Sequence, residues 1–390
     1  MFKFDPFLPQ YQDDPYPYYR ELRERYPAYK IEGRDIWLVS RYADIMDILK
    51  NPKTWSSQAN GNVINDSPER IGRTLGTTDP PRHEEMRKML SSVFTPASVA
   101  RQEPLIRAAA DRLIDDIASQ DECDLMKQFI EKLTASVIGY LLGIPDRDHD
   151  QLRQWTSTQR FDEQGRFLES RKQAEDNLVA YTQELVRERS KNPQNDLTSD
   201  LIRLKAEGAN LTEEDIVMTV RTIISAAFES TNLMFGNTLN ALSLHPDQLV
   251  MVEKDLSLLP NAIEEAVRWD TSAQGFQRTT TEDVVVGGTL IPRNTKVFVL
   301  YASGNRDESQ FENAEHFDIT RKPGKHLGFG WGPHVCIGAP LARLEMRIGI
   351  EQLLTRLGHY EIDRLQTVRR KTTPQFRGFS KLQVRFSKKK

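Results

Sequence analysis

A single cysteine lies in a glycine-rich stretch near the C-terminal end of the chain. Residues 329–338 read Phe-Gly-Trp-Gly-Pro-His-Val-Cys-Ile-Gly, and an amphipathic segment follows at 339–357. Glycine allows positive φ and the close approach of a flat group, while proline fixes part of the turn. The unpaired N–H groups at a helix start favour an anion. We therefore expect Cys336 to be held as a thiolate, the form that binds metals.

The residues alone leave three interpretations of Cys336 open. A buried structural cysteine is the common role of an isolated cysteine. A zinc site would use His326, His334 and Cys336, but it lacks a fourth ligand and a second thiolate. Haem iron needs one protein ligand from one side, and a thiolate is one of the ligands that proteins use.

Two cationic side chains lie at the start of another predicted helix. Residues 79–87 read Asp-Pro-Pro-Arg-His-Glu-Glu-Met-Arg, and the spacing of four places His83 and Arg87 on one helix face. The pair suits an anionic ligand. On these residues alone, a solvated basic face paired with Glu84 and Glu85 is the favoured interpretation.

A long helix is predicted over residues 212–244. Thr212 is a typical N-cap, acidic residues follow it, and His245-Pro246 ends the pattern. About 33 residues would extend roughly 50 Å. The middle, residues 225–232, reads Ser-Ala-Ala-Phe-Glu-Ser-Thr-Asn. Hydroxyl groups can bond back to helix carbonyls, but a buried Glu229 indicates a function.

The remaining patterns predict a mainly α protein with a smaller β-rich part. Residues 96–190 have apolar positions at helical spacing, whereas 36–40, 284–292 and 296–301 have strand character. Residues 54–78 are predicted to form a lid or substrate loop, with a plain surface loop as the alternative, and residues 159–167 are predicted to form a hinge between helices. Because no linker-like run divides the chain, we expect residues 1–390 to form a single domain.

Composition excludes several classes of protein. The 53 basic residues are interspersed with 56 acidic ones, which gives a net charge of −3 and no sign of nucleic-acid binding. The sequence has no signal-peptide core and no apolar span of about 20 residues, so we expect a cytoplasmic protein without a membrane anchor. Only Cys123 and Cys336 are present, and an iron ligand at one would leave no disulfide.

The cysteine stretch, followed by Ala-x-Leu-Ala-Arg-x-Glu at Ala339 to Glu345, resembles the haem-ligand signature of the cytochrome P-450 family. These proteins are haem-thiolate monooxygenases, and the resemblance is to the soluble bacterial type and covers nearly the whole chain. It implies the cytochrome P-450 fold, with haem b between the long central helix and the helix after the cysteine loop. It also implies that Cys336 is the axial ligand of the iron.

The resemblance implies roles for residues on both sides of the haem. Phe329 would lie against the porphyrin, and Gly338 would belong to the ligand loop. The side chains implied to bind the haem propionates are His83, Arg87, Arg278 and His334. Glu265 and Arg268 match a Glu-x-x-Arg pair whose buried bridge organises the loops beneath the haem.

The long helix carries the part of the resemblance that concerns oxygen. Residues 226–231, Ala-Ala-Phe-Glu-Ser-Thr, are similar to the family's Ala-Gly-x-(Asp/Glu)-Thr-Thr. This similarity implies that Glu229, Ser230 and Thr231 are catalytic and deliver protons. Ala227 stands where the family usually has glycine, and Ser230 replaces the usual threonine.

The implied activity is the insertion of one atom of O2 into a small organic substrate, by hydroxylation or O-dealkylation. The residues expected to line the substrate pocket are Ala226, Phe228 and Phe276. The chain has no flavin or nicotinamide motif, so we expect electrons from a ferredoxin and ferredoxin reductase, and a protein that acts as a monomer. The alternatives are a peroxide-driven or NO-reducing haem-thiolate enzyme, and a non-catalytic haem-binding sensor or carrier.

Overall fold

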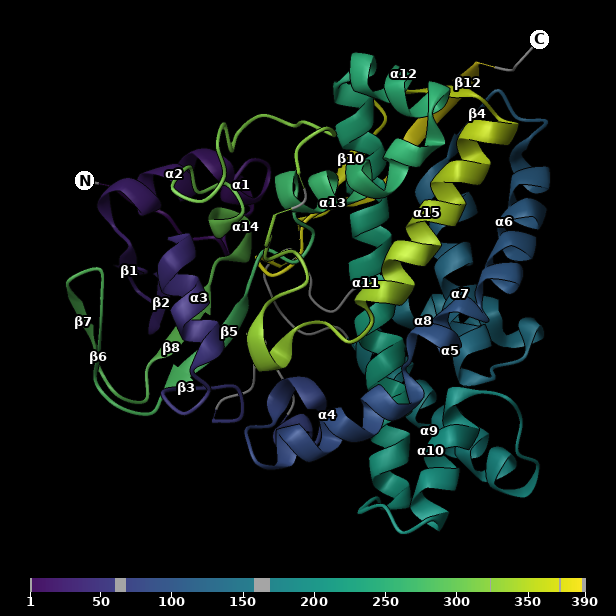
Figure 1. Ribbon diagram of the computed structural model, residues 1–390, viewed down its shortest axis with the longest axis horizontal. Coiled ribbons are helices and arrows are strands. Elements are labelled where there is room, and N and C mark those ends of the chain that lie inside the picture. The colour runs from purple at the N-terminus through teal and green to yellow at the C-terminus, as the bar shows by residue number, and fades with distance from the viewer. Residues whose placement is uncertain (1, 60–67, 158–168, 323, 372, 388–390) are drawn as a thin grey trace. The chain divides into compact units, whose positions relative to one another are not determined.

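The computed structural model describes residues 2–59, 68–157, 169–322, 324–371 and 373–387 (Figure 1). The predicted hinge at 159–167 and the middle of the predicted lid lie outside these residues. The chain folds into two compact units, each assembled from segments that are distant in sequence. Unit 1 comprises residues 1–88, 261–336 and 369–378, and unit 2 comprises residues 89–260, 337–368 and 379–390.

Unit 1 is built around a five-stranded sheet with the order β1-β2-β8-β5-β3. Strands β2 and β8 are parallel, and the other neighbouring strands are antiparallel. The strands of the sheet are β1 (Ala28–Lys30), β2 (Ile36–Val39), β3 (Trp55–Ser56), β5 (Phe276–Thr280) and β8 (Lys296–Val299). A separate hairpin pairs β6 (Val284–Val286) with β7 (Thr289–Ile291).

Unit 1 also contains several short helices. They are α1 (Pro9–Gln12), α2 (Tyr16–Arg25), α3 (Tyr42–Lys50), η1 (Pro68–Arg70), η2 (Leu75–Thr77), α14 (Tyr301–Gly304) and η6 (Gly332–His334). Most of α13 (Leu259–Trp269) and the first turns of α4 (Arg82–Val93) also belong to unit 1.

Strand β8 shows why the sheet is buried on both faces. Val297 and Val299 pack in one apolar cluster with Leu327, whereas Phe298 packs in another with Leu38. Because successive side chains of a strand point to opposite faces, a strand covered on both sides is a continuous apolar run. The sequence Val-Phe-Val therefore forms the centre of unit 1.

Unit 2 is predominantly helical. Its helices are α5 (Pro96–Ala100), α6 (Glu103–Ile117), η3 (Met126–Ile130), α7 (Glu131–Leu142), η4 (Asp146–Asp148), α8 (His149–Ser157), α9 (Glu169–Lys191), α10 (Leu197–Ala206), α11 (Glu213–Leu244), α12 (Pro246–Lys254), η5 (Leu256–Leu258) and α15 (Ala339–Arg356). Its strands are β4 (Glu122–Asp124), β9 (His359–Ile362), β11 (Phe379–Lys381) and β12 (Gln383–Ser387). β10 (Val368–Arg369) lies at the boundary of the two units. The order of the three-stranded sheet is β4-β12-β9.

Helix α11 organises unit 2 (Figure 1). It begins with a reciprocal cap between Thr212 and Asp215, and its residues 231–242 are buried on every side. In α15, a Cβ on Gly349 would lie 2.8 Å from ring atoms of Phe235, so this glycine allows α15 to approach α11 closely. The predictions of a long helix at 212–244 and of a mainly α protein are confirmed.

The described helices include none that is both long enough and apolar enough to pass through a lipid bilayer.

Candidate functional site

The cysteine loop of unit 1 depends on backbone geometry that glycine provides. Gly330 and Gly332 have φ angles of 69° and 71°, which side chains disfavour. A Cβ on Gly332 would lie 2.3 Å from the carbonyl oxygen of Leu49, so no larger residue fits there. The amide of Cys336 donates a hydrogen bond of 2.8 Å to the carbonyl of Phe329. The loop therefore presents Cys336 at the surface of the unit, while the Phe329 side chain is buried.

The surroundings of Cys336 decide between the earlier interpretations. Cys336 is exposed and Cys123 is buried, and within the described residues both are free of disulfides. His326 pairs with Glu264, with Nε2 2.9 Å from Oε2. The parts of the chain that the structure describes contain no group of three or more His, Cys, Asp or Glu side chains placed to hold a metal. The structure therefore supports neither a buried structural role for Cys336 nor a zinc site.

Four basic side chains gather beside this loop. The ring centroids of His83 and His334 lie 4.2 Å apart. Arg87, one turn after His83 in α4, donates a hydrogen bond of 2.8 Å to the carbonyl of Val335. Arg278, in β5, is 3% exposed and acts electrostatically on both imidazoles. The structure thus brings together the four side chains that sequence analysis assigned to the propionates.

The electrostatics of this basic cluster favour the binding of an anion. Both ring nitrogens of His83 and Nδ1 of His334 are buried without a hydrogen-bond partner among the described residues. Burial, then the charges of Arg278, His83 and Arg87, lower the pKa of His334 to about 2. Burial and Arg87 also lower the pKa of His83. Because unpartnered buried polar groups are costly, the cluster suits a ligand that carries carboxylates.

The central stretch of α11, in unit 2, differs from its expected burial. Glu229 was expected to be buried, but it is partly exposed, because continuous burial of the helix begins only at Thr231. The Ser230 hydroxyl donates a hydrogen bond of 2.7 Å to the carbonyl of Ala226. Phe228 is 3% exposed, and Ala226 is exposed. The back-bonding expected of hydroxyl residues in a helix is therefore present at Ser230.

Glu265 and Arg268 form a buried bidentate ion pair in α13. The two hydrogen bonds are 2.7 and 2.8 Å long. Arg268 also donates to the carbonyls of Asn305, Ala314 and His316. The pair therefore fixes the irregular segment that precedes the cysteine loop.

Gly338 is the N-cap residue of α15 in unit 2, and the N-cap has no side-chain hydrogen bond.

Phe276 begins β5 in unit 1, where its ring makes an edge contact with Phe376 at 6.2 Å and lies 5.8 Å from the ring of Tyr301. These aromatic side chains form an apolar corner at one end of the sheet.

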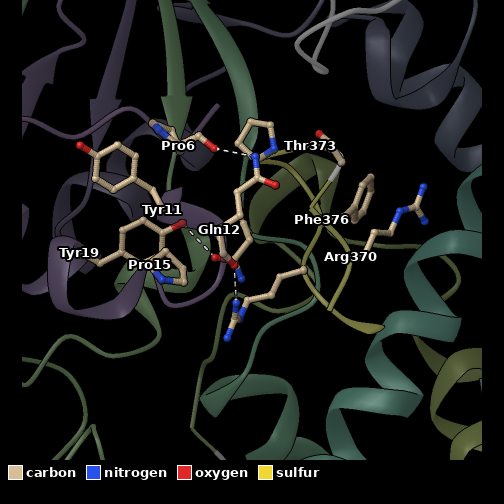
Figure 2. A pocket seen from close by; sticks show the side chains of 11 residues that line it. Pro6, Tyr11, Gln12, Pro15, Tyr19, Arg370, Thr373 and Phe376 are labelled. Atoms are coloured by element: carbon tan, nitrogen blue, oxygen red, sulfur yellow. Dashed lines mark hydrogen bonds between the residues drawn. The ribbon is translucent and has the colours of Figure 1, made fainter. Parts of the chain in front are cut away.

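Figure 2 shows a small cavity in unit 1 between the N-terminal segment and the segment around Phe376. Tyr19 donates a hydrogen bond of 2.9 Å to Gln274 beside it, and Arg377 donates to the carbonyl of Gln12. Its volume of about 20 Å³ holds roughly one water molecule. The cavity is too small for an organic substrate, and its lining contains none of the side chains predicted to bind haem or to deliver protons.

The whole chain can be compared with known proteins. The family model described as "Cytochrome P450" matches residues 6–387. The chain belongs to the cytochrome P450 family. This match includes segments of both units. That residues 1–390 form one haem domain stays a prediction.

Relatives of known name support this membership. The chain is 34% identical to the cyclomarin C epoxidase CymV of Salinispora arenicola, over 88% of this chain and 89% of that protein. It is also 34% identical to cytochrome P450 107B1 of Saccharopolyspora erythraea, over 87% and 86%. The structure of cytochrome P450 CYP109Q5 from Chondromyces apiculatus has a TM-score of 0.91 and 31% identity, and the similarity covers 99% of both chains.

Members of the family bind haem b, so haem b is the cofactor and the protein is a cytochrome P450 monooxygenase. The residues of unit 1 fit this group, because one exposed thiol and a buried basic cluster without an anionic partner occur in the same unit.

One contact of this cluster was not predicted from the sequence. The hydroxyl oxygen of Ser57 lies 3.2 Å from Nε2 of His334. The two residues are 277 positions apart, and no local pattern marks a serine in this loop.

Proposed function

We propose that this cytochrome P450 inserts one atom of dioxygen into a small organic substrate, by hydroxylation or O-dealkylation, with electrons from a ferredoxin and ferredoxin reductase. The observation that carries the proposal is the pairing of an exposed thiol with a basic cluster whose buried nitrogens lack partners among the described residues. A thiolate ligand and a binding site for two carboxylates together match the two kinds of contact that haem requires.

Each side chain of the cysteine loop and basic cluster takes a defined role in this proposal. Cys336 would bind the iron as a thiolate, and Phe329 would lie against the porphyrin. Hydrogen bonds and charge hold the propionates, because ionised carboxylates inside a protein need cations or donors. The residues that supply them are His83, Arg87, Arg278 and His334. Gly338, the N-cap residue of α15, would end the ligand loop.

Haem, when bound, supplies the oxidising chemistry, and the chain supplies protons and shape. The net reaction consumes dioxygen, two electrons and two protons, and it yields the oxidised substrate and water. Ser230 Oγ donates to the Ala226 carbonyl, and its lone pairs can hold a water molecule. Glu229, next to it and partly exposed, can exchange protons with solvent. Thr231 offers a second hydroxyl in this relay.

The names of similar proteins support a small organic substrate. CymV is a cyclomarin C epoxidase, and cytochrome P450 CYP109E1 of Bacillus megaterium, with a TM-score of 0.88 and 28% identity, was crystallised with testosterone. In this chain we propose that Phe228 and Ala226, in unit 2, and Phe276, in unit 1, each offer apolar surface to such a substrate. Rings and an alanine methyl group favour an apolar molecule.

A ferredoxin would meet a basic surface on unit 1. Lys88 is exposed and directly follows Arg87 in α4, and Lys325 places Nζ 5.7 Å from the ring of Trp331 in the cysteine loop. Complementary charges mainly raise the association rate and act less at high salt. A reduction rate independent of ionic strength would contradict this docking surface.

The test of the proposal is the CO spectrum of the reduced protein. The parent should give the spectrum of a thiolate-bound haem, Cys336→His the spectrum of an imidazole-bound haem, and Cys123→Ser the parent spectrum. Identical spectra for the parent and Cys336→His would refute the ligand assignment. With a ferredoxin and its reductase, a substrate should then consume oxygen and yield a product that contains one atom from dioxygen. Haem binding without turnover would favour the sensor or carrier.

A further inference from the structure

Ser57 is a buried hydroxyl residue at the end of β3, in contact with the basic cluster. It is 0% exposed, and its Oγ lies 3.2 Å from Nε2 of His334. That nitrogen is the only hydrogen-bond partner of the hydroxyl among the described residues. A buried hydroxyl group rarely leaves its proton unpaired. The Ser57 O–H therefore donates to Nε2, which must then be the unprotonated nitrogen of a neutral imidazole.

Asp79, just before α4, fixes the position of Ser57. One carboxylate oxygen, Oδ1, accepts a hydrogen bond of 2.8 Å from the amide of Ser57. The other, Oδ2, accepts from the hydroxyl of Ser56, and this hydroxyl oxygen in turn accepts from the amides of Gln58 and Ala59. Both carboxylate oxygens thus hold the turn that carries Ser57.

The proton position on His334 decides what the ring can bind. With Nε2 as the acceptor from Ser57, the proton is on Nδ1, which is buried without a partner among the described residues. A carboxylate accepts hydrogen bonds only, so it requires this Nδ1–H. The backbone of Leu75 competes for a ring proton. A proton on Nε2 would leave a lone pair on Nδ1, which cannot bind a carboxylate.

We propose that Ser57 is a positioning residue that keeps His334 in the Nδ1–H tautomer and so prepares it to donate a hydrogen bond to a carboxylate of the cofactor. The inference rests on the proposed function, in which the propionates of haem are the anionic ligands of the basic cluster. Asp79 supports this role, because its carboxylate accepts hydrogen bonds from the Ser57 amide and the Ser56 hydroxyl and so fixes the turn.

The test reads the tautomer in the haem-loaded protein. Protein labelled with ¹⁵N-histidine is reduced and saturated with CO, which gives a diamagnetic form, and long-range proton–nitrogen spectra show which ring nitrogen carries the proton. The spectrum of His334→Gln identifies the signal. We expect Nδ1–H in the parent and in Ser57→Thr, and a shift of the proton to Nε2 in Ser57→Ala.

A second measurement links the tautomer to ligand binding. Haem transfer to apomyoglobin should be about tenfold faster from Ser57→Ala, because a charge-assisted hydrogen bond is lost. Ser92→Ala is the matched control, since it removes an exposed hydroxyl from the same helix as His83. It should release haem at the parent rate.

The outcomes separate this inference from the proposed function. A parent with Nε2–H on His334, or Ser57→Ala with the parent's tautomer or haem release rate, overturns the role of Ser57. A parent whose CO complex lacks the thiolate spectrum refutes the ligand assignment instead. The tautomer of His334 in the haem-free protein then still decides whether Ser57 controls the ring.

Discussion

Glu345 should make the stability of the protein depend on pH in a direction opposite to that of most carboxylates. It lies in α15, where its side chain is 2% exposed. Its carboxyl oxygen Oε1 accepts a hydrogen bond of 2.5 Å from the hydroxyl of Thr134 in α7. In the described parts of the chain no basic side chain pairs with it. Burial therefore raises the pKa of Glu345 to about 8, and Thr134 offsets only part of this effect.

The magnitude follows from proton linkage. An acid whose pKa is raised in the folded state binds more protons there than in the unfolded chain, at every pH between the two pKa values. The free energy of unfolding therefore falls as the pH rises from about 4.5 to about 8. Each unit of pH contributes ~1.4 kcal/mol. Between pH 5 and pH 8 the loss is about 3–4 kcal/mol, because part of each titration lies outside this window.

The assay compares the parent with Glu345→Gln, which has nearly the same shape and does not titrate. Urea unfolding followed by circular dichroism at pH 5, 6, 7 and 8 gives the difference in unfolding free energy between the two proteins. Glutamine also brings an unpaired N–H group, but this constant offset cancels in the change of the difference with pH. Glu207→Gln, at an exposed residue after α10, is the control. A difference between parent and Glu345→Gln that stays constant from pH 5 to pH 8 would refute the reasoning.

Three further predictions concern the site and its support. Arg278→Ala should release haem to apomyoglobin about tenfold faster, whereas the exposed Arg293→Ala should not. Glu265→Gln leaves a buried guanidinium uncompensated and should lower the free energy of unfolding by about 3–5 kcal/mol in urea; an unchanged midpoint would contradict this. Ser230→Ala should give less product and more hydrogen peroxide per NADH oxidised, and Glu229→Gln should slow turnover. Parent-like coupling and rate in both variants would place proton delivery elsewhere.

Features whose signals are local could be predicted from the sequence. The start of α11 depends on Thr212 and Asp215, three residues apart, and its end on His245-Pro246. The ion pair of Glu265 and Arg268 also lies within one helix turn. The exposure of Glu229 could not be predicted, because helical periodicity does not say where neighbouring elements begin to cover a helix.

The sheet of unit 1 and the basic cluster depend instead on long-range pairing. β2 pairs with β8 across about 260 residues of sequence, and His83 contacts His334 across a similar separation. Conformational propensity at either residue says nothing about its partner. A resemblance to a family can propose roles for such residues, because its motifs mark residues that are distant in sequence but that the shared fold places close together.

That assignment stops at the residues of the motif. His334 belongs to the cysteine stretch, so the sequence alone could propose a propionate-binding role for it. Ser57 does not, and its hydrogen bond to His334 exists because Asp79 holds both the amide of Ser57 and the hydroxyl of Ser56. The proton position on His334 thus depends on a turn that lies 277 residues away in sequence. A side chain that orients a ligand-binding residue needs to supply only one hydrogen-bonding atom. Because many residue types can supply such an atom, no sequence motif marks its position.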